Sequence, residues 1–182
     1  MDEYVALLRG INVGRAKRIA MADLRACVEA AGGSEVRTIL SSGNVCFAGP
    51  RRSPRDWSSR IRSEIQKRAG FDCSVLVLEG TRFRDITRDN PILDAMSDGS
   101  RFLVAYFESA AVRESLVARM PPAVLPDRFA VGPDAAYLAC PAGVLDSPLS
   151  IAFTKLAGVG VTTRNWNTVL RIEAALNPKS GS

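Results

Sequence analysis

Three short polar segments of the sequence carry side chains suited to holding a charged ligand. They span residues 9–14, 41–44 and 162–168, and they are rich in Arg, Asn, Ser and Thr. A guanidinium group binds a phosphate or carboxylate through paired hydrogen bonds, and amide and hydroxyl groups complete such a site. The segments therefore predict a site for a small anionic, phosphate- or carboxylate-bearing ligand. The candidate ligand-binding residues are Arg9, Asn12, Ser42, Asn44, Thr163, Arg164, Asn165 and Asn167.

The third segment adds a helix terminus to this hypothesis. Apolar residues at helical spacing, from Trp166 to Leu176, predict a final helix that begins at Thr163. The free N–H groups and the dipole at a helix N-terminus favour an anion. The hypothesis requires that the three segments converge in the folded chain.

The composition excludes much catalytic chemistry. The sequence contains no histidine, which excludes a Ser-His-Asp triad, a Cys-His pair and every histidine metal site. The four cysteines, Cys27, Cys46, Cys73 and Cys140, show no C-x-x-C spacing, so we expect buried free thiols and neither a metal nor another cofactor. The polar segments hold no acidic residue. Catalytic residues are therefore not assigned, and whether the chain is an enzyme stays open.

Nucleic-acid binding is the first alternative. Lys and Arg number 24 against 19 Asp and Glu, a net charge of +5 that residues 1–91 carry. Basic side chains of this half are candidates for contacting phosphates. The expected strand around residues 44–49 has one aromatic and no basic residue, unlike an RNA-recognition motif, which weakens this alternative. Its candidate residues are Arg15, Lys17, Arg18, Arg51, Arg52 and Arg55.

A structural role for the same polar segments is the second alternative. Arg9 ends an apolar strand, where a buried guanidinium would need several acceptors. Asparagine side chains satisfy backbone groups in sharp turns, and Thr163 is placed to cap the last helix. In this interpretation the segments form a hydrogen-bonded seam between the two halves of a protein-interaction module.

The periodicity of apolar residues predicts an α+β fold. The first half has the order strand, helix, strand, strand, helix, strand, which is typical of a ferredoxin-like unit. Ser53 followed by Pro54 is typical of a helix start, and Gly70 of a helix end. The expected elements are a strand at 4–8, a helix at 21–31, strands at 36–40 and 45–48, a helix at 54–69 and a strand at 73–78.

The second half repeats this order, and Ser147 followed by Pro148 repeats the helix start. We therefore predict two ferredoxin-like units in tandem, the second with an extra C-terminal helix. The expected elements are a strand at 102–107, a helix at 110–120, strands at 128–131 and 135–140, a helix at 149–156 and a strand at 159–162. The predicted domains are residues 1–80 and 101–182, joined by a connecting helix and linker at 81–100.

The sequence says little about the cellular location and the oligomeric state of the protein. The acidic start resembles no signal peptide, and no apolar stretch approaches the roughly 20 residues of a membrane span. With reduced thiols expected, we predict a cytoplasmic protein without a membrane partner. The oligomeric state stays open.

The stretches YVALLRGINVG at residues 4–14 and TTRNWNT at residues 162–168 are the most distinctive in the chain. With residues 21–25, 36–38, 42–45 and 90–91, they resemble the bacterial domain of unknown function 1697 family. The resemblance spans nearly the whole chain and implies two ferredoxin-like subdomains and no established activity. Arg15 stands where the family usually has a second glycine, and Ala20 where it commonly has a proline. Arg15 adds charge to the loop and reduces its backbone freedom, which weakens, without excluding, a phosphate held through the backbone N–H groups of the loop.

Overall fold

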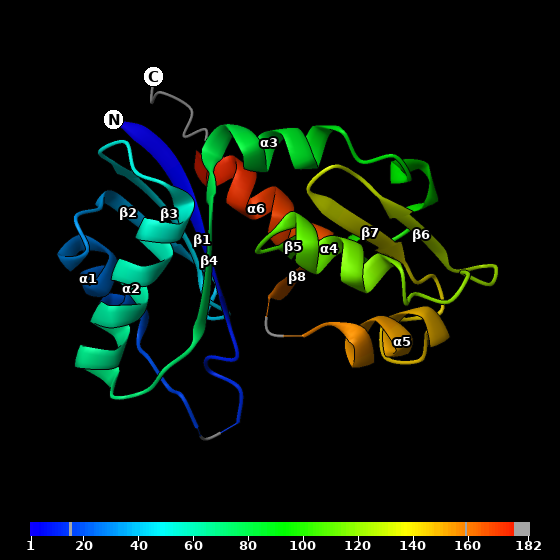
Figure 1. Cartoon of the computed structure of the whole chain (residues 1–182), viewed down its shortest axis with the longest axis horizontal. Coiled ribbons are helices and arrows are strands. Elements are labelled where there is room, and N and C mark those ends of the chain that lie inside the picture. The colour runs from blue at the N-terminus through cyan, green and yellow to red at the C-terminus, as the bar shows by residue number, and fades with distance from the viewer. Residues whose placement is uncertain (15, 159, 177–182) are drawn as a thin grey trace. The chain divides into compact units, whose positions relative to one another are not determined.

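The structure, a computed structural model (Figure 1), describes residues 1–14, 16–158 and 160–176. The chain divides into two units. Unit 1 comprises residues 1–84 together with the chain from residue 171 onward, and unit 2 comprises Asp85–Leu170. The last helix therefore begins in unit 2 and ends in unit 1. Within the described residues, no helix is both long and apolar enough to cross a membrane.

Unit 1 contains one four-stranded antiparallel sheet in the order β2-β3-β1-β4. Its β2 strand carries a register shift between Ser34 and Arg37, where Glu35 takes a positive φ of 49°. Bulges of this kind redirect the side chains that follow them. The elements are β1 (Asp2–Arg9), α1 (Met21–Ala30), β2 (Ser34–Ile39), β3 (Asn44–Gly49), α2 (Pro54–Ala69), β4 (Ser74–Glu79) and α3 (Gly80–Arg88), the last of which crosses into unit 2.

The core of unit 1 lies between one face of this sheet and the helices α1 and α2, which cover it side by side (Figure 1). Its centre is aromatic: the ring of Phe47 lies 5.4 Å from that of Tyr4 and 4.9 Å from that of Trp57. The α2 helix starts as its sequence predicts, because the Ser53 hydroxyl accepts a hydrogen bond from the Asp56 N–H at 3.2 Å. Gly70 then ends it in the left-handed conformation.

The second face of the sheet in unit 1 is also buried. Val5 and Leu7 of β1 have no exposed area, and Cys46 of β3 is 2% exposed. The Sγ atom of Cys46 lies 3.6 Å from the Ile172 carbonyl oxygen of the last helix. The β1 strand is therefore buried on both faces, as its continuous apolar run favours.

Unit 2 contains a second four-stranded antiparallel sheet in the order β6-β7-β5-β8. Its apolar core includes Ala105, Leu116, Leu138 and Phe153. The elements are β5 (Phe102–Phe107), α4 (Ala110–Val117), β6 (Arg128–Val131), β7 (Ala135–Ala139), α5 (Pro148–Leu156), β8 (Val161–Asn165) and α6 (Trp166–Leu176). Two short 3-10 turns, Leu93–Ala95 and Gly99–Arg101, precede β5 within the stretch expected to be a linker.

The predicted start of the last helix is wrong. Residues Val161–Asn165 form β8, which pairs with β5 so that Thr163 lies opposite Ala105, and α6 begins only at Trp166. The run of Val161, Thr162 and Thr163 is β-branched, and such residues favour a strand over the first turn of a helix. The expected anion-binding helix terminus at Thr163–Asn165 is therefore absent from those residues.

The close packing of Trp57 against Gly49 gives a test of the core. A Cβ atom at Gly49 would lie 2.5 Å from Cζ2 of the buried indole, so Gly49→Ala forces the ring to move. We expect a loss of about 1–3 kcal/mol in the free energy of unfolding, the usual cost of overpacking a core. Gly158→Ala is the matched control, because its Cβ would meet nothing within 4 Å. Equal losses in urea unfolding for both variants would contradict this packing.

Candidate functional site

The loop after β1 is fixed by the side chain of Asn12. Its Nδ2 atom donates to the carbonyl oxygens of Ile19 at 3.1 Å and Ser41 at 2.9 Å. Its Oδ1 atom accepts from the Ile19 N–H at 2.9 Å, and its own N–H donates to the Lys17 carbonyl oxygen at 3.0 Å. Asn12 adopts a φ of 54°, a conformation that asparagine tolerates better than most residues. One amide therefore closes the loop and ties it to the hairpin between β2 and β3.

That hairpin is fixed by a second asparagine. Asn44 is fully buried, and its Nδ2 atom donates to the Ile39 carbonyl oxygen at 2.8 Å and to the Ser42 hydroxyl at 3.1 Å. The Leu8 N–H donates to the Gly43 carbonyl oxygen at 2.8 Å, which joins the hairpin to β1. Unit 1 thus brings the first two polar segments together.

Arg9 departs from the expectation of a buried guanidinium. The buried stretch of β1 ends at Leu8, and Arg9, the last residue of the strand, is exposed. Lys17 and Arg18 of the following loop are exposed as well, as is Ser42 at the hairpin tip. We call Arg9, Lys17 and Arg18, with the loop between them, the basic loop. Arg15 lies within this segment but outside the described residues.

The acidic residue next to the basic loop already has a partner. Asp72 forms an ion pair with Arg62. Hydrogen bonds from Arg62 hold the pKa of this carboxyl below its usual range, with a smaller contribution from the charge of Lys17. Arg18 donates through Nε to the Gly14 carbonyl oxygen at 3.1 Å, a contact that keeps its charge at the surface.

The third polar segment lies in unit 2. Asn165, and not Thr163, caps α6: its Oδ1 atom accepts from the Thr168 N–H at 2.9 Å. Asn167 is exposed and packs beside Gly99, where an added Cβ would lie 2.3 Å from Oδ1 of the asparagine. These contacts give Asn165 a structural role and place Asn167 against the 3-10 turn before β5.

Arg164 is a partly buried cation of β8. It lies opposite Val104 in the sheet, on the face that also presents Thr162 and Tyr106, and donates through Nη1 to the Thr163 carbonyl oxygen at 2.8 Å. Burial lowers the pKa of the guanidinium to about 10. The group therefore remains a cation at neutral pH. Arg9 and Arg164 belong to different units, and the convergence of the three segments stays a prediction.

Of the basic residues at the start of α2, one already interacts within the protein and two are exposed. Arg52 forms an ion pair with Asp56 at 3.2 Å, and its guanidinium carbon lies 5.5 Å from the centre of the Trp57 ring. Hydrogen bonds from Arg52 and Arg60 lower the pKa of Asp56. Arg51 and Arg55 are exposed.

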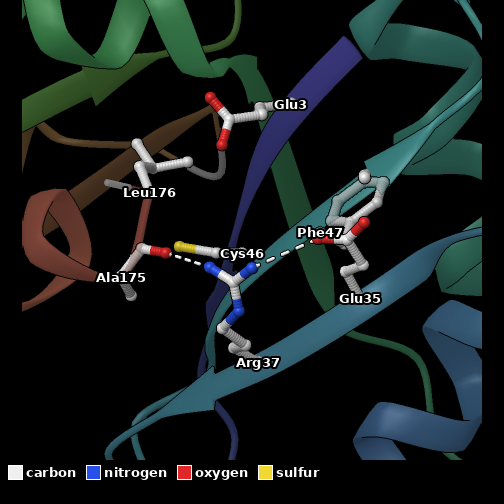
Figure 2. A pocket seen from close by; sticks show the side chains of 8 residues that line it. Glu3, Glu35, Arg37, Cys46, Phe47, Ala175 and Leu176 are labelled. Carbon is white, nitrogen blue, oxygen red and sulfur yellow. Dashed lines mark hydrogen bonds and ion pairs between the residues drawn. The ribbon is translucent and has the colours of Figure 1, made fainter. Parts of the chain in front are cut away.

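A small pocket in unit 1 is lined by none of the candidate ligand-binding residues (Figure 2). Arg37 of β2 reaches across it to the Ala175 carbonyl oxygen of α6, and the Cys46 thiol lies beside it. The contact joins residues 138 positions apart, so no local motif signals it. The pocket is lined by Glu3, Glu35, Arg37, Cys46, Phe47, Ala48, Ala175 and Leu176.

The four thiols are poor nucleophiles where they stand. All four cysteines are buried and free, as the sequence predicts. Burial raises the pKa of each thiol, to about 12 for Cys46 and about 11 for Cys73. At neutral pH they are therefore protonated, and the thiolate is the reactive form. Among the described residues, no three Cys, Asp or Glu side chains are grouped to hold a metal ion.

Comparison with known proteins identifies relatives without an assigned activity. A family model described as "Protein of unknown function (DUF1697)" matches residues 1–137. No curated protein matches the chain. Among solved structures, the conserved bacterial protein SP0830 from Streptococcus pneumoniae is 20% identical with a TM-score of 0.73, over 96% of this chain and 98% of that one. At that identity the likeness shows the fold alone.

Replacing Asn12 tests whether one side chain fixes the loop. Asn12→Ala removes three hydrogen bonds to backbone groups, each with a net contribution of about 1 kcal/mol. We expect about 2–3 kcal/mol less stability in urea unfolding and faster amide hydrogen exchange at Ile19. Asn167→Ala is the matched control, because that asparagine is exposed. An Asn12 variant as stable as the control would refute the role of this amide.

The cap on α6 gives a second test. Asn165→Ala removes the acceptor of the Thr168 N–H, and losing an N-cap costs about 1 kcal/mol. Thr163→Val keeps the shape of the side chain in β8 and should cost less, because Thr163 is not the cap. The melting temperatures of the two variants show which residue caps α6. A lower melting temperature for the Thr163 variant than for the Asn165 variant would favour Thr163 as the cap.

Proposed function

The chain belongs to the DUF1697 family of proteins of unknown function, and from that premise we propose that it binds a small anionic ligand through the basic loop of unit 1. The ligand class is a phosphate- or carboxylate-bearing small molecule. One observation carries the proposal: Asn12 fixes a loop from which three cationic side chains face solvent. The proposed role is binding, and no catalytic group is assigned.

The hydrogen bonds that tie Asn12 to Lys17 and Ile19 distinguish this loop from an ordinary basic stretch. A ligand that meets an ordered loop does not have to order it, so less conformational entropy is lost on binding. Between Asn12 and Lys17 the loop is closed by a backbone hydrogen bond of 3.0 Å. The hairpin with Ser42 is tied to the same loop through the Ser41 carbonyl oxygen.

The charge of the loop selects an anion. Residues 9–22 contain no acidic residue, and the neighbouring Asp72 is paired with Arg62. Guanidinium groups such as those of Arg9 and Arg18 favour phosphate and carboxylate oxygens through paired hydrogen bonds. Because these side chains are exposed, we expect modest affinity that weakens as salt is added.

The candidate residues take two roles in this proposal. Arg9, Lys17, Arg18 and the Ser42 hydroxyl contact the ligand. Asn12 and Asn44 position the loop and the hairpin through bonds to backbone groups. In an extended form of the proposal, the third polar segment meets the first two. The site then also includes Thr163, Arg164, Asn165 and Asn167. The charge that Arg164 keeps at neutral pH supports that form.

Nucleic-acid binding is the second candidate, favoured by the exposure of Arg51 and Arg55 before α2. Nucleic-acid binding is the weaker candidate because Arg52, between these two arginines, already pairs with Asp56 and lies over the Trp57 ring. A structural role for the polar segments is supported for the three asparagines that satisfy backbone groups. It does not account for the exposed cations of the basic loop.

We propose that both units are ferredoxin-like, which the strand orders β2-β3-β1-β4 and β6-β7-β5-β8 support. As subdomains of the repeated strand and helix order we propose residues 1–80 and 101–182, with 81–100 as their connection; by compactness, residues 171–176 of α6 belong to unit 1. A cytoplasmic location is proposed from the four free cysteines.

Titration with inorganic pyrophosphate tests the proposed site. We expect binding by isothermal titration calorimetry that is about tenfold weaker in Arg9→Gln and in Arg18→Gln, because each loses a charge-assisted bond of roughly 1.4 kcal/mol or more. Arg55→Gln is the matched control, an exposed arginine of the same unit outside the basic loop.

Two results would contradict the proposal. One is pyrophosphate and citrate binding that is unchanged in the two loop variants. The other is binding of a single-stranded oligonucleotide alone, with a loss in Arg51→Gln and Arg55→Gln, which would favour the nucleic-acid alternative.

A further inference from the structure

The C-terminal end of α6 is held in unit 1 by arginines from other elements. The last turn of α6 contains no basic residue of its own, although the last carbonyl groups of a helix favour positive partners. Arg37 of β2 donates to the Ala175 carbonyl oxygen, and Arg84 of α3 donates to the Leu176 carbonyl oxygen at 3.3 Å. We call Arg37 and Arg84 the arginine clasp.

Each arginine of the clasp has a carboxylate as a second partner. Nη2 of Arg37 lies 3.4 Å from the Glu35 carboxylate, on the bulge of β2 (Figure 2). Nη2 of Arg84 pairs with the Glu3 carboxylate of β1. If the helix carbonyl leaves, neither guanidinium is left without an anionic partner. Separating α6 from the clasp therefore costs the two hydrogen bonds to its carbonyl groups but leaves no buried charge unpaired.

The closed state is favoured by apolar contacts on the same turns. Ile172 is fully buried and Leu176 is 3% exposed. Beneath them lies the Cys46 thiol, opposite Arg37 in the register of β2 and β3. The adjoining pocket is small, and each of its charged side chains, Glu3, Glu35 and Arg37, stands in an ion pair, so it offers little to a ligand.

We propose that residues 171–176 of α6 form a strap that opens from unit 1 as one segment while the rest of the unit stays folded, with the arginine clasp as its fastening. Opening breaks two bonds to helix carbonyls and leaves the ion pairs with Glu35 and Glu3 in place. It also uncovers the Cys46 thiol, which the strap shields from solvent. The closed strap is the resting state because Ile172 and Leu176 are buried in it. The proposal is independent of ligand binding at the basic loop.

Alkylation of the native full-length chain measures this opening directly. N-ethylmaleimide at constant pH, followed by mass spectrometry of peptides, reports the labelling rate of each cysteine. The variant Arg37→Gln with Arg84→Gln should label Cys46 at least tenfold faster than the wild type. Cys27, on the buried face of α1, and Cys140, in unit 2, should keep their rates. Arg37→Lys, which retains the charge and a donor, should restore most of the protection when Arg84 is intact.

Arg128→Gln is the matched control, because it breaks an ion pair with Asp94 in unit 2 and should leave Cys46 labelling unchanged. An unchanged Cys46 rate in the double variant overturns the proposal. Rates that rise together at Cys46, Cys27 and Cys140 also overturn it, since they show that the chain opens globally.

Hydrogen exchange of the wild type provides a test that needs no variant. The amides of residues 171–176 should exchange together and at least tenfold faster than the buried amides of α1. A strap that exchanges as slowly as α1 overturns the proposal, because its opening would then require unfolding of unit 1.

Discussion

This structure depends on one constraint: the backbone N–H and carbonyl groups at the ends of strands and helices, which have no partner within their own element, must be hydrogen-bonded. Each such N–H or carbonyl must find a partner when it is withdrawn from water. In unit 1, the amides of Asn12 and Asn44 supply partners for the loop after β1 and for the β2–β3 hairpin. In unit 2, Asn165 does the same for the first turn of α6. The distinctive asparagines of the sequence are therefore explained first by hydrogen bonding.

The same constraint separates positioning residues from residues that face solvent. The side-chain amides of Asn12 and Asn44 donate hydrogen bonds to acceptors within the protein. The side chains of Arg9, Lys17 and Arg18, in contrast, are exposed. The cations of the basic loop offer charge and hydrogen bonds to an anion, and the proposed function rests on them.

Much of the fold could be predicted because its signals are local. The serine–proline pairs at Ser53 and Ser147 mark helix starts, and alternating or continuous apolar runs mark most strands. The last helix was misplaced because Trp166, Val169 and Leu176 share a helical face whether the helix begins at Thr163 or at Trp166. The β-branched run at residues 161–163 favours a strand, and pairing with β5 places Thr163 in one. The exposure of Arg9 likewise depends on where β1 leaves the sheet. The contact of Arg37 with Ala175 depends on two segments that meet only in the folded unit.

The central claim is that the loop fixed by Asn12 binds a small anion. Backbone amide chemical shifts measured by NMR during a titration with inorganic pyrophosphate test it most directly. We predict saturable shifts at residues 10–18 and 41–43, with an unperturbed α2 N-terminus, and the loss of these shifts in Asn12→Ala. Shifts confined to residues 51–55, or none that saturate, would contradict the account.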